Sequence, residues 1–214
     1  NLPYITVDAE KNPLFLDDLR AGFARVRRNT RQLQDFHLRL SRVRVLDPAC
    51  GCGNFLVVAY RELRLLELEV LRARYGEDAG LGAGLVQSIV HVDQFAGIEV
   101  EEWPAQIAQV AMWLTDHQMN LRVSEEFGRA YVRLPLRRSA NIVHGNALAV
   151  EWGELMAEPG EWYVVGNPPF IGHQWRGAAQ VADMARIWGQ DGRFRRLDYV
   201  TCWHAKAARI MRER

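Results

Sequence analysis

The feature that most constrains the fold of this chain is an apolar strand that leads into a glycine-rich turn and then a long helix. Residues 43–46 form a short run that contains two β-branched valines, Asp47 follows it, and glycines stand at positions 51 and 53. From Phe55 to about Tyr75 the apolar residues continue over a helical stretch. Strand, glycine-rich turn and helix in this order are the first unit of a doubly wound α/β sheet. The sequence therefore predicts an α/β fold with a mostly parallel sheet.

The alternation of strand and helix continues along the chain. Core strands are expected at residues 43–46, 95–99, 141–144 and 162–166. Residues 105–119 predict a helix with Pro104 in its first turn, and residues 88–92 are expected to add an edge strand. Upstream, the apolar spacing within residues 14–40 predicts two amphipathic helices. We accordingly expect an N-terminal helical segment over residues 1–42 and an α/β core over residues 43–214.

Composition excludes several broad classes. With 214 residues and 49% hydrophobic content, the chain is long and apolar enough to bury one sizeable core. No window is long and apolar enough to cross a bilayer, so we expect a cytoplasmic protein without a membrane partner. Its net charge of +1 does not by itself indicate a nucleic-acid partner, and the arginine clusters are typical of solvated helix faces. Three cysteines, at positions 50, 52 and 202, are too few to predict a zinc site, so no metal is expected.

Polar residues follow each of the core strands. Asp47, Glu99, Asn146 and Asn167 all stand where a strand ends, and ligands of open parallel sheets bind outside these carboxyl ends. Taken alone, the glycines of the first turn fit a tight turn as well as a nucleotide site. Glu99 ends the second strand, where a carboxylate can accept hydrogen bonds from ribose hydroxyls. The pattern favours a nucleotide with a carboxylate tail, held by the turn and the following helix N-terminus.

The last of these strands is followed by Asn167, Pro168, Pro169 and Phe170. Consecutive prolines restrict the backbone and lack N–H donors, so carbonyl oxygens can be held toward a ligand. An amine could donate one hydrogen to the Asn167 side-chain oxygen and one to the Pro168 carbonyl. Its lone pair would then remain directed at an electrophilic methyl group, and Phe170 could stack on the ring that carries the amine.

These motifs resemble those of a known enzyme family. Residues 47–56 look like the cofactor motif, and residues 167–170 the catalytic motif, of adenine-specific DNA methyltransferases. Residues 93–99, 117–120, 133–136 and 197–200 resemble more narrowly the methylase region of MmeI-like (type IIL) restriction-modification enzymes. The resemblance implies a Rossmann-like class I methyltransferase fold and transfer of a methyl group from S-adenosylmethionine to the N6 amine of adenine in double-stranded DNA. The target adenine must then be flipped out of the stack.

Carried over to this chain, the resemblance implies three groups of site residues. The catalytic group is Asn167, Pro168, Pro169 and Phe170, and Asp198 and Tyr199 fall where a further motif lines the target-base pocket. Residues expected around the cofactor are Asp47, Pro48, Ala49, Gly51, Gly53, Asn54, Phe55, Glu99, Val100, Asn146 and Ala147. Many relatives have aspartate at position 146, where this chain has asparagine. Transfer is direct, so no cysteine is expected to act as a nucleophile.

Two other functions remain open on the sequence. Asparagine followed by two prolines and an aromatic residue also serves methylation of protein glutamine and of RNA bases, and a non-catalytic nucleotide-binding or DNA-binding module is a further alternative. Neither a domain that reads the DNA sequence nor a cluster of endonuclease residues is recognisable here. Recognition, and any endonuclease activity, are therefore expected in other parts of a longer parent chain.

Overall fold

The fold is built on one parallel sheet. A computed structural model describes residues 15–76, 88–127, 139–189 and 194–212. Its strands are β1 (Val43–Asp47), β2 (Phe95–Glu99), β3 (Asn141–His144) and β4 (Glu161–Val164). They lie in the order β3-β2-β1-β4, and every pairing is parallel. The chain thus builds outward from β1 to β3 and then returns to the other side of β1, which places the topological switch point between β1 and β4. The prediction of a doubly wound α/β fold is confirmed.

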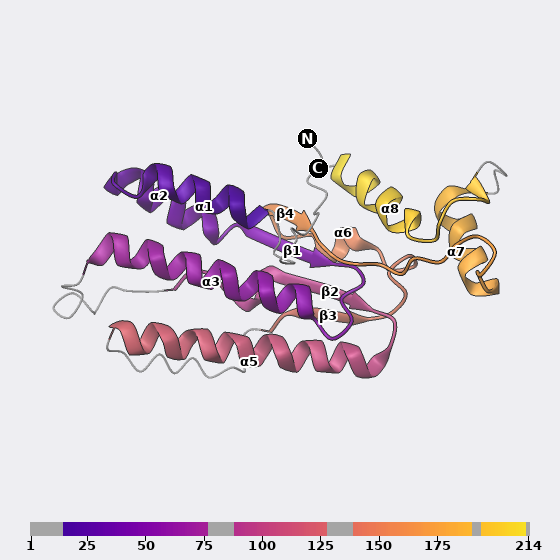
Figure 1. Ribbon diagram of the computed structural model, residues 1–214, viewed down its shortest axis with the longest axis horizontal. Helices are drawn as coiled ribbons and strands as arrows, with labels where there is room; N and C mark the ends of the chain where they lie inside the picture. The colour runs from indigo at the N-terminus through magenta and orange to yellow at the C-terminus, as the bar shows by residue number, and fades with distance from the viewer. Residues whose placement is uncertain (1–14, 77–87, 128–138, 190–193, 213–214) are drawn as a thin grey trace.

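Helices cover both faces of this sheet (Figure 1). Their bounds are α1 (Phe15–Val26), α2 (Thr30–Leu40), α3 (Asn54–Tyr75), α5 (Glu102–Phe127), α6 (Trp152–Leu155), α7 (Ala178–Trp188) and α8 (Thr201–Arg212). The two amphipathic helices expected near the N-terminus are α1 and α2. Asn29 caps α2, because its side chain accepts a hydrogen bond from the Gln32 backbone N–H at 3.1 Å. Among the described helices, none is long and apolar enough to cross a membrane.

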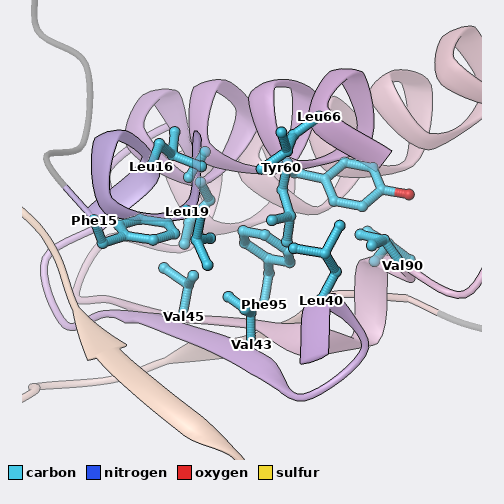
Figure 2. Close-up of a cluster of buried hydrophobic side chains, with 14 of the residues drawn as sticks. Phe15, Leu16, Leu19, Leu40, Val43, Val45, Tyr60, Leu66, Val90 and Phe95 are labelled. Atoms are coloured by element: carbon cyan, nitrogen blue, oxygen red, sulfur yellow. The ribbon is translucent and has the colours of Figure 1, made fainter. Parts of the chain in front are cut away.

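Alternation along the strands directs their side chains into two different core clusters. Val43, Val45 and Phe95 point to one face, where α1, α2 and α3 bury them (Figure 2). Leu46 and Ile98 point to the other face, under α6, α7 and α8. A strand directs successive side chains to opposite faces, so a sheet with helices on both faces needs apolar residues at nearly every position. The first cluster includes α1 and α2, so the helical lead-in and the α/β core share one hydrophobic core.

The expected edge strand over residues 88–92 is wrong. The chain there is irregular and then forms a single 3-10 turn, Val92–Gln94. The buried carboxylate of Glu67 on α3 accepts hydrogen bonds from the backbone N–H groups of Ile89 and Val90, at 2.6 and 3.0 Å. Those N–H groups are unavailable to a neighbouring strand, and a side chain replaces the sheet as their partner.

The helix expected over residues 105–119 is longer than its apolar pattern indicated. Helix α5 begins at Glu102 and ends at Phe127. Beyond Met119, its buried face continues through Asn120, a polar residue whose Oδ1 accepts a hydrogen bond from buried Arg64 on α3 at 2.9 Å. A hydrophobic pattern cannot identify such a buried position, because the side chain there is polar and its hydrogen bonds are satisfied within the protein. The fourth strand, expected over residues 162–166, begins one residue earlier, at Glu161, and ends two residues earlier, at Val164.

Candidate active site

The turns that follow β1 and β4 approach each other closely at the switch point. Gly166 has φ 144°, and a Cβ built on it would lie 2.5 Å from Oδ1 of Asp47. No side chain fits at that separation, so a glycine is required for the two turns to meet. From the face of the sheet that α6, α7 and α8 cover, the indole N–H of Trp203 on α8 donates to the Pro48 carbonyl at 2.9 Å. The cofactor motif and the catalytic motif of the sequence analysis are therefore adjacent.

The two glycines of the turn after β1 are required for different physical reasons. Gly53 has φ 85°, and an added Cβ would lie 3.0 Å from the Cβ of Ala108 on α5. Gly51 has φ 53° and open space where a Cβ would stand. Its N–H donates to Glu99 Oε2 at 2.9 Å, and Glu99 Oε1 accepts from the Glu101 N–H at the same distance. Gly53 thus serves helix packing, whereas Gly51 leaves backbone accessible beside a fixed carboxylate.

Asp47 lies fully buried beneath these turns. Its Oδ1 accepts a hydrogen bond from the Ala49 N–H at 3.0 Å, and its Oδ2 has no partner. Burial raises the pKa of Asp47 to about 7; the Ala49 N–H opposes this shift, and the nearby charge of Glu99 adds to it. A buried, unpartnered carboxylate oxygen is costly unless a ligand compensates it, which fits a cationic group bound at this turn.

Stability should therefore depend on pH through Asp47. The folded-state pKa lies above that of the unfolded chain, so the folded chain binds more protons between about pH 4 and pH 7. Stability falls as pH rises through that window and levels off above it. Between about pH 5 and pH 8 we expect the free energy of unfolding of the wild type to fall by about 2 kcal/mol. The Asp47→Asn variant lacks the titrating carboxyl, so this pH-dependent fall should be absent from it. Urea denaturation at a series of pH values measures it, and equal pH slopes for the two proteins would contradict the assignment.

A cavity of about 530 Å³ opens at the carboxyl ends of the strands. This volume is within the range of small-molecule sites. Its lining includes these predicted site residues: Pro48, Ala49, Glu99, Val100, Asn146, Ala147, Asn167, Pro169 and Tyr199. Other predicted residues lie outside the lining: Asp47, Gly51, Gly53, Asn54, Phe55, Pro168, Phe170 and Asp198. Phe170 is 72% exposed and extends from the same loop as Asn167.

Asp183 on α7 is a site residue that the sequence analysis missed. It lines the cavity, is 4% exposed, and accepts two hydrogen bonds from Asn146 Nδ2, at 3.1 and 3.0 Å. Tyr199 donates its hydroxyl to Asp183 Oδ2 at 2.7 Å, and Asn146 Oδ1 accepts from the Leu148 N–H at 2.9 Å. These contacts orient the Asn146 amide unambiguously. The only sequence signal was a single acid on the apolar helix α7, which without the fold has no visible partner.

Asp198 holds the loop that carries the catalytic motif. Its Oδ1 accepts hydrogen bonds from the N–H groups of Ile171 and Val200, both at 3.0 Å. In addition, the Tyr199 N–H donates to the Ile171 carbonyl at 3.1 Å. The segment before α8 is thereby joined to the segment after Phe170. The observed contacts of Asp198 are to this backbone.

The two buried cysteines, Cys50 and Cys202, are poor nucleophiles. Burial raises the pKa of Cys50 to about 12 and that of Cys202 to about 11, so both remain thiols at neutral pH. Cys52 is exposed and free. Within the described ranges, no cluster of histidine, cysteine and acidic side chains could hold a metal ion.

Comparison with known proteins assigns the chain to a family. The model of the MmeI DNA-methyltransferase domain matches residues 23–214. The chain belongs to this family. It resembles the type IIL restriction-modification enzyme MmeI, solved in complex with DNA, with 47% identity and a TM-score of 0.83 over 92% of this chain. It is also 37% identical, over 195 residues and 89% of its length, to DNA methyltransferase A of Bacillus subtilis (strain 168).

Membership of the MmeI methyltransferase-domain family confirms the resemblance and the Rossmann-like methyltransferase fold expected from the motifs. The chain spans 26% of the length of MmeI and 22% of that of DNA methyltransferase A. Of the stretches that carried the resemblance, residues 133–136 lie outside the described part of the structure. The others lie on β2, on α5, in the turns after β1 and β4, and in the segment before α8.

Proposed function

We propose that this DNA-methyltransferase domain transfers a methyl group from S-adenosylmethionine to the N6 amine of adenine in DNA, as part of a restriction-modification polypeptide. The observation that carries the proposal is the position of Asn167. It lines the same cavity as Glu99 and Asn146, so one of the two proposed acceptors for an amine lies beside the expected nucleoside site. The identity of the family and the DNA complex of MmeI favour DNA as the substrate.

The residues of the cavity fit S-adenosylmethionine. When bound, it supplies an electrophilic methyl group on a sulfonium. Glu99 already accepts one backbone N–H on each carboxylate oxygen, and the second lone pair of each oxygen can accept a ribose hydroxyl. Asp47, with one unpartnered oxygen, offers compensation for a positive charge on the methionine part. Gly51 supplies the N–H that fixes one Glu99 oxygen, and no side chain projects from this position.

On the substrate side, the chain positions an amine and restricts its hydrogens. The Asn167 side-chain oxygen and the Pro168 carbonyl accept the two N–H groups, which leaves the lone pair directed at the methyl group. Phe170, mostly exposed in the absence of DNA, is available to stack on a flipped adenine. Orientation and exclusion of water account for the acceleration, so no covalent nucleophile is needed.

The alternatives differ in their observable products. A glutamine or RNA methyltransferase would use the same acceptors, and we favour DNA because the family and both relatives are described by their DNA chemistry. A non-catalytic nucleotide-binding module would need neither Asn167 nor the exposed Phe170. Formation of N6-methyladenine in DNA, and not in RNA or as methylglutamine in protein, distinguishes the proposed function from all of these alternatives.

Calorimetric titration with S-adenosylmethionine tests the cofactor assignment. Glu99→Ala is expected to weaken binding about tenfold to hundredfold, because it removes charge-assisted hydrogen bonds. Glu158→Ala, an exposed acid away from the cavity, is the matched control and should bind as the wild type does. Thermal denaturation of each variant verifies folding, since Glu99 also holds two backbone N–H groups. Unchanged affinity in a folded Glu99→Ala variant would reject the ribose role.

A further inference from the structure

The loop after the catalytic motif displays a second exposed aromatic side chain. Trp175 is 84% exposed, more than any other large hydrophobic residue that the structure describes. A turn holds it in place, in which the Trp175 N–H donates to the Gly172 carbonyl at 2.9 Å. At the end of the loop, Gln180 of α7 accepts from the Gly177 N–H. Trp175 and Phe170 therefore extend from one ordered loop between β4 and α7.

A second cavity, of about 430 Å³, lies beside this loop. Cationic or titratable residues in its lining are His173, Arg176 and Arg195, and its aromatic residues are Trp188 and Phe194. The two rings are stacked, with centroids 4.6 Å apart. Asp183 of α7 lines the first cavity, whereas Met184 and Trp188 line the second, so the two sites share this helix. Cations interleaved with aromatic rings are a combination suited to nucleic acid.

The charge around the loop is positive although the whole chain is almost neutral. Among residues 166–189 and 194–198, the arginines are Arg176, Arg186, Arg195 and Arg196, and the acids are Asp183 and Asp198. Both acids are engaged by protein donors, Asp183 by Asn146 and Tyr199, and Asp198 by two backbone N–H groups. Arg195 and Arg196 are exposed. The surface thus complements phosphate rather than an apolar protein partner.

We propose that Trp175 enters the DNA stack in the space left by the flipped adenine, while the exposed Arg195 and Arg196 contact the phosphates beside it. The proposal rests on the proposed function, since it presupposes an adenine that leaves the duplex. Extrusion of a base costs unstacking and unpairing energy, and an aromatic side chain that stacks on the neighbouring bases recovers part of it. Phe170 stacks on the flipped base, whereas Trp175 stacks on the neighbouring bases of the duplex that the flipped base leaves. Packing of another protein domain on this loop is the rival explanation for the exposed tryptophan.

Fluorescence anisotropy with two labelled duplexes tests this role. The duplexes are identical except that one carries an abasic site in place of a single adenine, so its gap exists without extrusion. The wild-type chain should bind the abasic duplex about tenfold more tightly, a value within the range for aromatic stacking on bases. Trp175→Ala should remove that preference. Arg195→Gln should weaken binding to both duplexes equally and reduce the salt dependence.

The controls lie away from the loop. Trp113→Ala on α5 and Arg31→Gln on α2 change exposed residues of the same types, and both should leave the preference intact; α2 and α7 are at opposite ends of the molecule (Figure 1). A wild-type chain without preference for the gap, or a Trp175→Ala variant that keeps it, would overturn the inference.

Titration with S-adenosylmethionine separates the two proposals. If the cofactor binds and N6-methyladenine forms while Trp175→Ala behaves as wild type, only the Trp175 role fails; if the wild type binds no cofactor, the proposed function fails.

Discussion

Replacing Asn167 by alanine is expected to reduce methyl transfer to DNA about a hundredfold or more, while binding of S-adenosylmethionine remains within about twofold of wild type. The side-chain oxygen of Asn167 is one of two acceptors proposed to orient the target amine, and loss of one aligned polar contact in the transition state has an effect of this size. Asn167 is exposed at the cavity mouth, so its truncation removes little from the core.

The measurement is single-turnover methyl transfer with the chain in excess over DNA. N6-methyladenine is quantified by mass spectrometry after digestion, and cofactor affinity is measured by calorimetry on the same preparation. Asn141→Ala, which changes an exposed asparagine on β3, is the control and should have wild-type rates. Equal losses of cofactor affinity and of transfer would place Asn167 in cofactor binding and would contradict the proposed role.

Glu67→Ala is expected to lower the free energy of unfolding by about 3–5 kcal/mol, the largest stability effect that we predict. Glu67 is fully buried on α3 and is the shared acceptor of a polar network. It accepts hydrogen bonds from Ser88 Oγ at 2.6 Å and from the backbone of residues 89 and 90, with His37 Nε2 at 3.2 Å and Arg64 Nε 3.3 Å away. Burial favours the neutral acid, but the contacts with His37, Arg64 and Ser88 hold the pKa of Glu67 below its ordinary value.

Removing Glu67 leaves Arg64 as a buried charge with less compensation, and this penalty dominates the expected loss. Arg64 retains Tyr60, Asp116 and Asn120 as partners, so the network weakens rather than vanishes. Chemical denaturation with a linear extrapolation measures the change. Glu69→Ala, an exposed acid two residues along α3, should change stability by less than about 0.5 kcal/mol. Similar values for the two variants would show that the network contributes little.

Local patterns in the sequence were sufficient for the parallel sheet and for the two loops of the site. Apart from Arg44, β1 and β2 consist of apolar residues and Gly97 up to the acid that ends each strand. That pattern is typical of a sheet with both faces covered, so the parallel sheet and the position of the site at its carboxyl edge follow from general rules of α/β folds. The strand order β3-β2-β1-β4 became known only from the structure. The turn after β1 and the proline pair after β4 also depend on local backbone geometry, which residue identity largely determines.

Contacts between distant residues decided the rest, and no local pattern reports them. The segment at residues 88–92 has the composition of a strand, but Glu67, more than 20 residues earlier, takes its N–H groups. Asp183 belongs to the site only because α7 packs where Asn146 and Tyr199 can reach its carboxylate. Gly166 is required because Asp47 lies 2.5 Å from where its Cβ would be. The sequence by itself determined the class of fold and the types of residue at the strand ends, since both depend on local periodicity and residue type. Only the tertiary structure decided which side chains share a cavity. Burial and hydrogen bonding pair residues without regard to their separation along the chain.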